Sequence, residues 1–101
     1  MPTIELKIVP PAVPLKRDTK KIYVEGSTIY DVFDLLYKSY LAYDKKYQNG
    51  KWVNVLWGYI VYKNDRVIGA FDQDGFKAFK DADVLLNDGD KIHLVLPVGG
   101  G

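Results

Sequence analysis

Residues 26–43 read GSTIYDVFDLLYKSYLAY, and they decide the fold because they carry the main amphipathic helix that the sequence predicts. Gly26 and Ser27 break the preceding strand pattern. Thr28 and Asp31 match the Ser/Thr-x-x-Asp/Glu opening, in which side chains satisfy the free N–H groups of a first helical turn. A helix is therefore expected to begin near Ile29. Its apolar positions recur at helical spacing on one face, namely Ile29, Val32, Phe33, Leu36, Tyr40 and Tyr43.

Strand patterns flank this helix on both sides. Residues 3–9 alternate, with Ile4, Leu6 and Ile8 on one face, as in a half-buried strand. After a proline-containing loop, further strands are predicted at 20–25, at 52–63 with an irregularity at Gly58, at 66–68 and at 91–96. Residues 44–51 are expected to be a polar connection and 69–86 to be irregular, with a turn at Asn64-Asp65 between strands.

This order of elements predicts an α+β fold of the β-grasp (ubiquitin-like) type. We expect a mixed four- to five-stranded sheet with one main helix packed on one face. The other sheet face would remain open, and Glu5, Lys7, His93 and Val95 are expected to lie on it. The predicted organisation is one β-grasp domain, 1–96, followed by a flexible C-terminal glycine tail, 97–101.

Composition excludes several classes of function. With 14 basic and 13 acidic side chains the net charge is +1, so no long-range field attracts nucleic acid, and no direct nucleic-acid partner is expected. The chain has no cysteine, which excludes disulfides and thiolate metal sites. No apolar stretch is long enough to span a membrane, and residues 1–11 do not resemble a signal peptide. We therefore expect a cytoplasmic protein without a membrane partner.

The end of the sequence is its most unusual feature. Asp88-Gly89-Asp90 predicts a strong turn, the strand 91–96 follows, and Pro97-Val98-Gly99-Gly100-Gly101 comes directly after it. Glycine has no Cβ, so a run of glycines can enter a channel that is too narrow for side chains. By itself, however, such a run is also what a frayed terminus looks like.

The ending, taken as a whole, resembles the C-terminal signature of the MoaD/ThiS family of ubiquitin-like sulfur carriers, which are related to the ubiquitin-related modifiers. In that signature an Asp-Gly-Asp turn, an apolar strand and Pro-Val precede a terminal diglycine, which here falls on Gly100-Gly101. The junction Glu25-Gly26-Ser27-Thr28 also looks like the strand-to-helix junction of the family. Lys91, Leu96 and Gly99 depart from its usual residues.

The resemblance implies that the chain is a protein co-substrate and not itself an enzyme. An activating enzyme would adenylate the carboxylate of Gly101 with ATP, next to Gly100, and a sulfur donor would convert it to a thiocarboxylate. Val95, Leu96, Pro97, Val98 and Gly99 would contact the partners. No cofactor or metal is expected on the chain, because ATP is used by the activating enzyme. The implied role is the small subunit of molybdopterin synthase, which acts with a larger subunit in molybdenum cofactor biosynthesis.

Two alternatives remain open. The same activated carboxylate could be conjugated to lysines of target proteins, as in ubiquitin-like modifiers, or could supply sulfur for tRNA thiolation. In the second alternative the chain is a non-reactive β-grasp interaction module. An aromatic docking surface is conceivable for that module, although packing beneath the helix end would explain the same residues, which are Trp52, Trp57 and the tyrosines at 40, 43, 47, 59 and 62.

Other polar residues are not predicted to be sites. The lone His93 is expected to face solvent. A group of aspartates, Asp72, Asp74, Asp81 and Asp83, misses the spacing of an EF-hand and is interpreted as solvated turn carboxylates.

Overall fold

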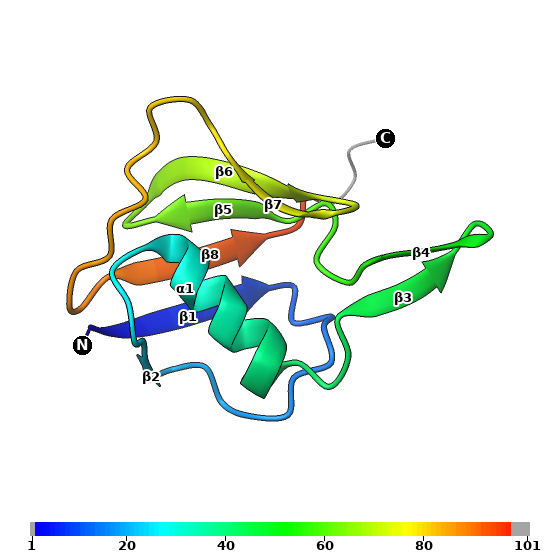
Figure 1. The fold of residues 1–101 in the computed structure, drawn as a ribbon, viewed down its shortest axis with the longest axis horizontal. Helices are drawn as coiled ribbons and strands as arrows, with labels where there is room; N and C mark the ends of the chain where they lie inside the picture. The colour runs from blue at the N-terminus through cyan, green and yellow to red at the C-terminus, as the bar shows by residue number, and fades with distance from the viewer. Residues whose placement is uncertain (1, 98–101) are drawn as a thin grey trace.

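A computed structural model describes residues 2–97 of the chain. This part is an α+β fold in which the helix lies against one face of a curled, mixed sheet (Figure 1). The sheet has six strands in the order β2-β1-β8-β5-β6-β7, and a separate two-stranded sheet contains β3 and β4. The strand bounds are β1 Thr3–Val9, β2 Ile22–Tyr23, β3 Lys45–Gln48, β4 Lys51–Asn54, β5 Ile60–Lys63, β6 Arg66–Asp72, β7 Gly75–Ala78 and β8 Lys91–Val95.

Strands β1 and β8 form the parallel centre of the sheet. Leu6 lies beside Ile92 and Ile8 beside Leu94 in the register of the two strands. All four side chains are buried in the core, together with the apolar face of the helix. Glu5 and Lys7 are exposed on the opposite sheet face, and His93 and Val95 are half-buried there. The alternation predicted for both strands is therefore confirmed.

The helix begins where the sequence predicts. Helix α1, Ile29–Leu35, opens with the carboxylate of Asp31 accepting hydrogen bonds from the N–H groups of Ser27 and Thr28 and from the Thr28 hydroxyl. The bonds from Thr28 to the charged carboxylate, backbone first, hold the pKa of Asp31 below its usual value.

The helix ends earlier than its apolar spacing suggested. It continues as one turn of π-helix, η1 (Leu36–Tyr40), in which the N–H of Leu41 donates to the carbonyl of Leu36 at 2.9 Å. Leu41 itself is extended. The expectation that Tyr43 lies on the buried face is therefore wrong, and its side chain is exposed.

The predicted single strand over 52–63 is also wrong. Gly58 has φ +101° and interrupts it, so that β5 begins only at Ile60. Residues 51–54 pair instead with 45–48, although the sequence pattern predicts a connection there. The turn between them is Asn49-Gly50, with φ +51° and +81°, which is the turn chemistry that favours a two-residue hairpin.

The sheet is larger than the four to five strands expected. Strand β6 extends to Asp72 and is followed by β7, although 66–68 was predicted as a short strand and 69–86 as irregular. Gly69 makes this pairing possible, because a Cβ there would collide with the carbonyl of Lys77 and the ring of Phe76. Strand β2 is shorter than its prediction, 20–25, and comprises Ile22–Tyr23.

An ion pair helps to fix the segment between β7 and β8 to the sheet. Lys63 on β5 is buried, and its Nζ donates to Oδ2 of Asp83 at 2.8 Å. Asp83 also accepts from the N–H of Leu85. These hydrogen bonds, the one from Lys63 first, hold the pKa of Asp83 below its usual value.

The stabilisation that this pair provides should be lost at acidic pH. Because the pKa of Asp83 is lower in the folded state, its stabilising effect is complete above the unfolded-state pKa of about 3.9 and is lost as the pH falls through the folded-state value. We expect Asp83→Asn to lower the urea midpoint at pH 6, and the difference from the wild type to shrink steadily as the pH falls below about 4. Urea titrations at several pH values test this, and a constant difference between the two proteins would contradict it.

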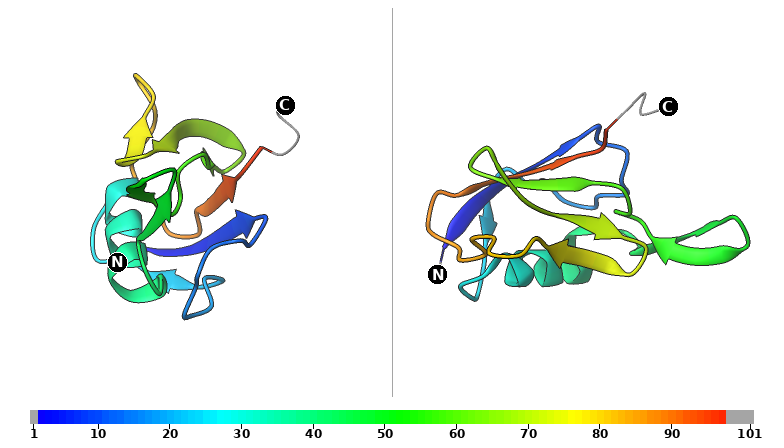
Figure 2. Two further views of the ribbon diagram at one scale, coloured as in Figure 1. Left: turned by 90° about the vertical axis from the view of Figure 1, so that its right-hand side faces the viewer. Right: turned by 90° about the horizontal axis from the view of Figure 1, so that it is seen from above.

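The two turned views show the helix and the sheet as separate layers, with β3 and β4 extending beyond them at one end (Figure 2). Within residues 2–97, no helix has the length and apolar character that crossing a membrane requires.

Candidate functional site at the end of strand β8

The Asp-Gly-Asp turn before β8 forms hydrogen bonds with the start of β1 and with the turn between β5 and β6. Oδ1 of Asp88 accepts from the N–H of Thr3 at 2.7 Å, and the N–H of Gly89 donates to the carbonyl of Thr3 at 2.8 Å. The buried carboxylate of Asp90 accepts from the side chain of Asn64 and from the N–H of Asn87. The turn therefore sets the register of β8 against β1 and against the β5–β6 turn.

The other end of β8 is held equally firmly. Val95 pairs with Val9 on one side and with Ile60 on the other. One residue further on, the N–H of Leu96 donates to the carbonyl of Val9 at 2.8 Å. The Leu96 side chain is half-buried and packs against the core. The sheet thus controls the path of the chain through Leu96.

Of the predicted site residues, the structure brings Val95 and Leu96 together at this end of the sheet. Pro97 follows them and is exposed. Val98, Gly99, Gly100 and Gly101 lie outside the described residues. The tail predicted at 97–101 is therefore described only at its first residue.

Gly58 lies beside Leu96, and the sequence pattern indicated it only as an irregularity within a strand. A Cβ at this position would lie 3.0 Å from Cδ1 of Leu96, and its φ of +101° favours glycine. The close approach of Gly58 and Leu96 is a contact between distant segments, so no local pattern signals it.

We expect Gly58→Ala to destabilise the fold through both effects. Left-handed backbone alone costs about 1–2 kcal/mol for a residue with a Cβ. Gly89→Ala is the matched control, because Gly89 also has a positive φ, +86°, but a Cβ added there would meet nothing within 4 Å. Urea unfolding should show a larger loss of unfolding free energy for Gly58→Ala than for Gly89→Ala. An equal loss would mean that the Leu96 side chain moves aside without a measurable energetic penalty.

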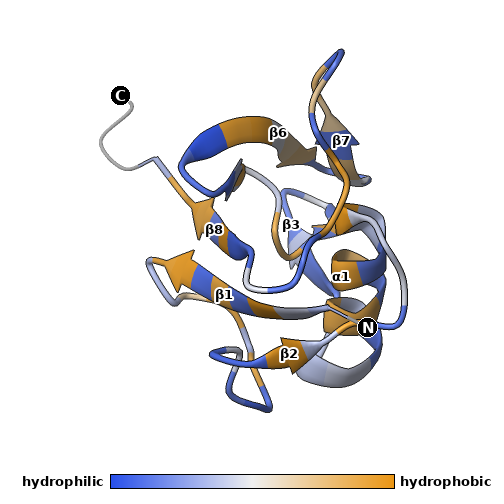
Figure 3. Ribbon diagram, turned by 90° about the vertical axis from the view of Figure 1, so that its left-hand side faces the viewer, coloured by the Kyte–Doolittle hydropathy of each residue, from blue (hydrophilic) through white to orange (hydrophobic). Residues whose placement is uncertain are grey.

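The open sheet face is apolar beside the end of β8. The strand registers place Val9, Val95, Ile60 and Ala70 in one row across four strands. Val9 is exposed and the other three are half-buried. Figure 3 shows the hydrophobic ends of β1 and β8 next to the point where the chain leaves the sheet. Neither Ile60 nor Ala70 was predicted here: the predicted strand 52–63 contained Ile60 but not its partners, and Ala70 lay in the segment 69–86 that was predicted to be irregular.

The aromatic residues are divided between the two interpretations that the sequence left open. Tyr40 and Tyr59 are buried in the core, and the Tyr59 hydroxyl donates to the carbonyl of Pro10 at 2.8 Å. Tyr43, Tyr47 and Trp52 are exposed, as is Trp57 to a smaller extent. Packing in the core therefore explains Tyr40 and Tyr59, but it does not explain the exposed tyrosines and tryptophans.

The remaining polar candidates do not form a catalytic or metal centre. His93 is half-buried beside Lys7 and Tyr62 in the strand registers. Asp72 accepts from backbone N–H groups of its own turn, and Asp83 is paired with Lys63. Among residues 2–97, no three His, Asp or Glu side chains are grouped so that they could hold a metal ion.

Two shallow hollows lie away from the end of β8, one beside α1 and one beside Lys63. The arrangement at the end of β8 consists of apolar side chains and backbone hydrogen bonds, so it can hold and direct a chain segment.

Comparisons with protein-family models, with curated proteins and with solved structures found no match.

Proposed function

We propose that the protein is a sulfur carrier that works through the carboxylate of Gly101. The observation that carries this proposal is the fixation of β8 between β1 and β5 up to Leu96, immediately before the sequence Pro97 to Gly101. The sheet fixes the position from which the glycine-rich segment starts, and glycines make that segment narrow enough to enter the channel of a partner enzyme.

The proposed chemistry takes place in partner enzymes. A carboxylate is a poor electrophile, so an activating enzyme first joins the Gly101 carboxylate to the α-phosphorus of ATP and pyrophosphate leaves. Hydrosulfide from a sulfur donor then attacks the acyl carbon, the bond to AMP breaks so that AMP leaves, and a thiocarboxylate remains on Gly101. The carrier needs no cysteine for this step, because the sulfur is held on the main chain.

The strand order supports a β-grasp fold for residues 1–96. Its centre is the parallel pair β1–β8, with β2 beside β1 and β5 beside β8, and with one helix on one face. Strands β6 and β7 and the hairpin β3–β4 are additions to that core.

The acceptor that we propose is a larger subunit of a molybdopterin synthase. The apolar row of Val9, Ile60, Ala70 and Val95 supports this, because it offers a contact surface directly beside the departing chain. Apolar centres of this kind are common in protein interfaces.

An intact-mass measurement tests the sulfur carrier proposal. The purified chain is incubated with ATP, a sulfur donor and, one at a time, each adenylating enzyme from the same organism. We expect a mass increase equal to the replacement of one oxygen by sulfur with one of these enzymes, and only when ATP is present. An unchanged mass with all of them would contradict the proposal.

A second candidate is a protein modifier that passes the same activated carboxylate to lysine amines, or a sulfur carrier for tRNA thiolation. The enlarged sheet and the exposed hairpin β3–β4 favour a modifier, because they add surface that a receptor could recognise. Tryptic peptides from cells should then contain lysines linked to residues 92–101, the peptide that follows Lys91. Their absence, together with a thiocarboxylate, would favour the pure carrier.

A further inference from the structure

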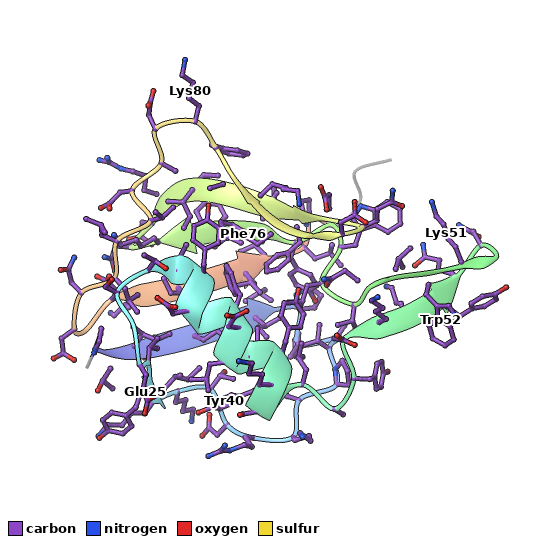
Figure 4. All side chains as sticks on the ribbon, viewed as in Figure 1. Glu25, Tyr40, Lys51, Trp52, Phe76 and Lys80 are labelled. Carbon is purple, nitrogen blue, oxygen red and sulfur yellow. The ribbon has the colours of Figure 1, made fainter. Side chains whose placement is uncertain are left out.

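The hairpin β3–β4, residues 45–54, carries an exposed aromatic pair and is called the aromatic arm below. Tyr47 and Trp52 are directly opposite each other in the register, and their rings meet edge to face with centroids 5.4 Å apart. Their side chains are 64% and 67% exposed. Figure 4 shows Trp52 on the arm, beyond the body of the fold. The two rings therefore form an apolar surface that the fold itself leaves uncovered.

The arm is basic, and one of its three lysines lies on the face of the two rings. The arm contains Lys45, Lys46 and Lys51, and the only acidic neighbour in its sequence is Asp44 at its base. Strand alternation places Lys45 on the same side as Tyr47, whereas the Nζ of Lys51 donates to Oε1 of Gln73 at 2.9 Å. A partner that covers the rings would therefore gain from acidic groups around an apolar centre.

The base of the arm is fixed to the fold. The N–H of Val55 donates to the carbonyl of Asp44 at 2.9 Å, and the N–H of Asn54 donates to the carbonyl of Gln73 at 3.1 Å. Nδ2 of Asn54 donates to the hydroxyl of Tyr37 at 2.7 Å, and Val53 is buried. An isolated two-stranded hairpin is only marginally stable in water, so these contacts give the arm its direction.

The arm projects from the end of the molecule at which the chain leaves β8 (Figures 1 and 2). Gly58, four residues after the arm, lies against Leu96, and β5 begins beside Val95. Whatever their conformation, the four residues 98–101 span at most about 14 Å. An enzyme that acts on the carboxylate of Gly101 must therefore approach this same end of the molecule.

We propose that the aromatic arm docks on the activating enzyme, in a cleft with an apolar floor and an acidic rim. This inference rests on the proposed function, because it assumes an enzyme that binds Gly101. A protein fits better than a nucleic acid, since the net charge of the chain is only +1 and supplies no long-range field for phosphates.

Kinetics of pyrophosphate exchange test this docking. The activating enzyme is the one that produces the thiocarboxylate on the wild-type chain, and the carrier is varied as the substrate. We expect Trp52→Ala and the double variant Lys45→Glu/Lys46→Glu each to raise KM about tenfold, with kcat within about twofold, as for a central interface residue. Trp52→Phe should keep a KM near that of the wild type.

The chain supplies its own matched control at the start of the sheet. Tyr23 on β2 is 60% exposed, and Nζ of Lys21 lies 5.7 Å from its ring centroid. Tyr23 pairs with Thr3, at the opposite end of β1 from the departing chain. We expect Tyr23→Ala and Lys21→Glu to leave KM unchanged, although they remove an exposed ring and a lysine as the arm variants do.

The outcomes separate the two proposals. Wild-type chain that supports no exchange with any adenylating enzyme would overturn both. Normal exchange with the same KM for arm and control variants would overturn only the docking. The docking would also be overturned if a fluorescein-labelled single-stranded oligonucleotide bound the chain in a Trp52-dependent way while the arm variants left KM unchanged. If Trp52→Ala fails to fold, as judged by its melting curve, the charge variant decides the question, and a KM equal to that of the control variants would overturn the docking.

Discussion

Deletion of Gly100 and Gly101 is expected to abolish ATP-dependent activation and to leave the melting temperature nearly unchanged. Leu96 donates to Val9 and packs beside Gly58, and it already closes the core that the structure describes, so we expect the melting temperature to change little. Activation does depend on them, because misplacing a reacting group by about 1 Å can already cost about 10²-fold in rate. Gly101→Ala and Gly100→Ala should also impair activation.

Pyrophosphate exchange and thermal melting, measured on the same preparations, check this pair of effects. A large fall in melting temperature would show that the terminal residues are packed against the fold. If the truncated chain kept its full biological function, it would support the alternative of a non-reactive interaction module instead.

The replacement of Leu94 by alanine is expected to give the largest loss of stability among the variants considered. Leu94 is fully buried at the centre of the sheet, between Ile8 and Val61 in the strand registers. Removal of a buried leucine side chain costs about 2–5 kcal/mol, through lost transfer energy and the cavity that remains. Because β8 directs the chain toward Gly101, activation should fall at temperatures where the variant unfolds.

His93→Ala is the matched control for this effect. His93 is the adjacent residue on β8, but it lies on the opposite, open face and is only half-buried. Its replacement should change the free energy of unfolding by less than about 1 kcal/mol. Urea titration gives both values, and equal losses would contradict the burial pattern of β8.

The parts of the fold that the sequence predicted correctly are those in which local pattern and core packing agree. Ile4, Leu6 and Ile8 alternate because one sheet face of β1 is buried, and Ile92 and Leu94 do the same on β8. The start of α1 was equally predictable, because Asp31 satisfies the N–H groups of Ser27 and Thr28 from only a few residues away.

The errors arose where distant contacts override the local signal. Strand β7 depends on the ring of Phe76 fitting over Gly69, and Tyr43 is exposed because Leu41 leaves the helix. The hairpin β3–β4 did have a local signal, Asn49-Gly50, but its charged flanks resemble a connection. A strand that packs little against a core does not need alternating apolar residues, so its polar sequence is easily mistaken for a loop.

The turn and the strand that precede the candidate site were predictable from sequence, but the surroundings of the strand end were not. The Asp88-Gly89-Asp90 turn and the strand after it point to the end of β8 from sequence alone, and both are in place. The contact of Gly58 with Leu96 and the row formed by Ile60 and Ala70 come from strand order, which no single segment reveals.

The central claim is that sulfur is carried on the carboxylate of Gly101. After reaction with ATP, the activating enzyme and a sulfur donor, trypsin should release residues 92–101 as one peptide, because no lysine or arginine follows Lys91. Tandem mass spectrometry of this peptide should place the exchange of oxygen for sulfur on Gly101. Sulfur on any other residue, or an unmodified peptide from a chain that the enzyme has adenylated, would contradict the claim.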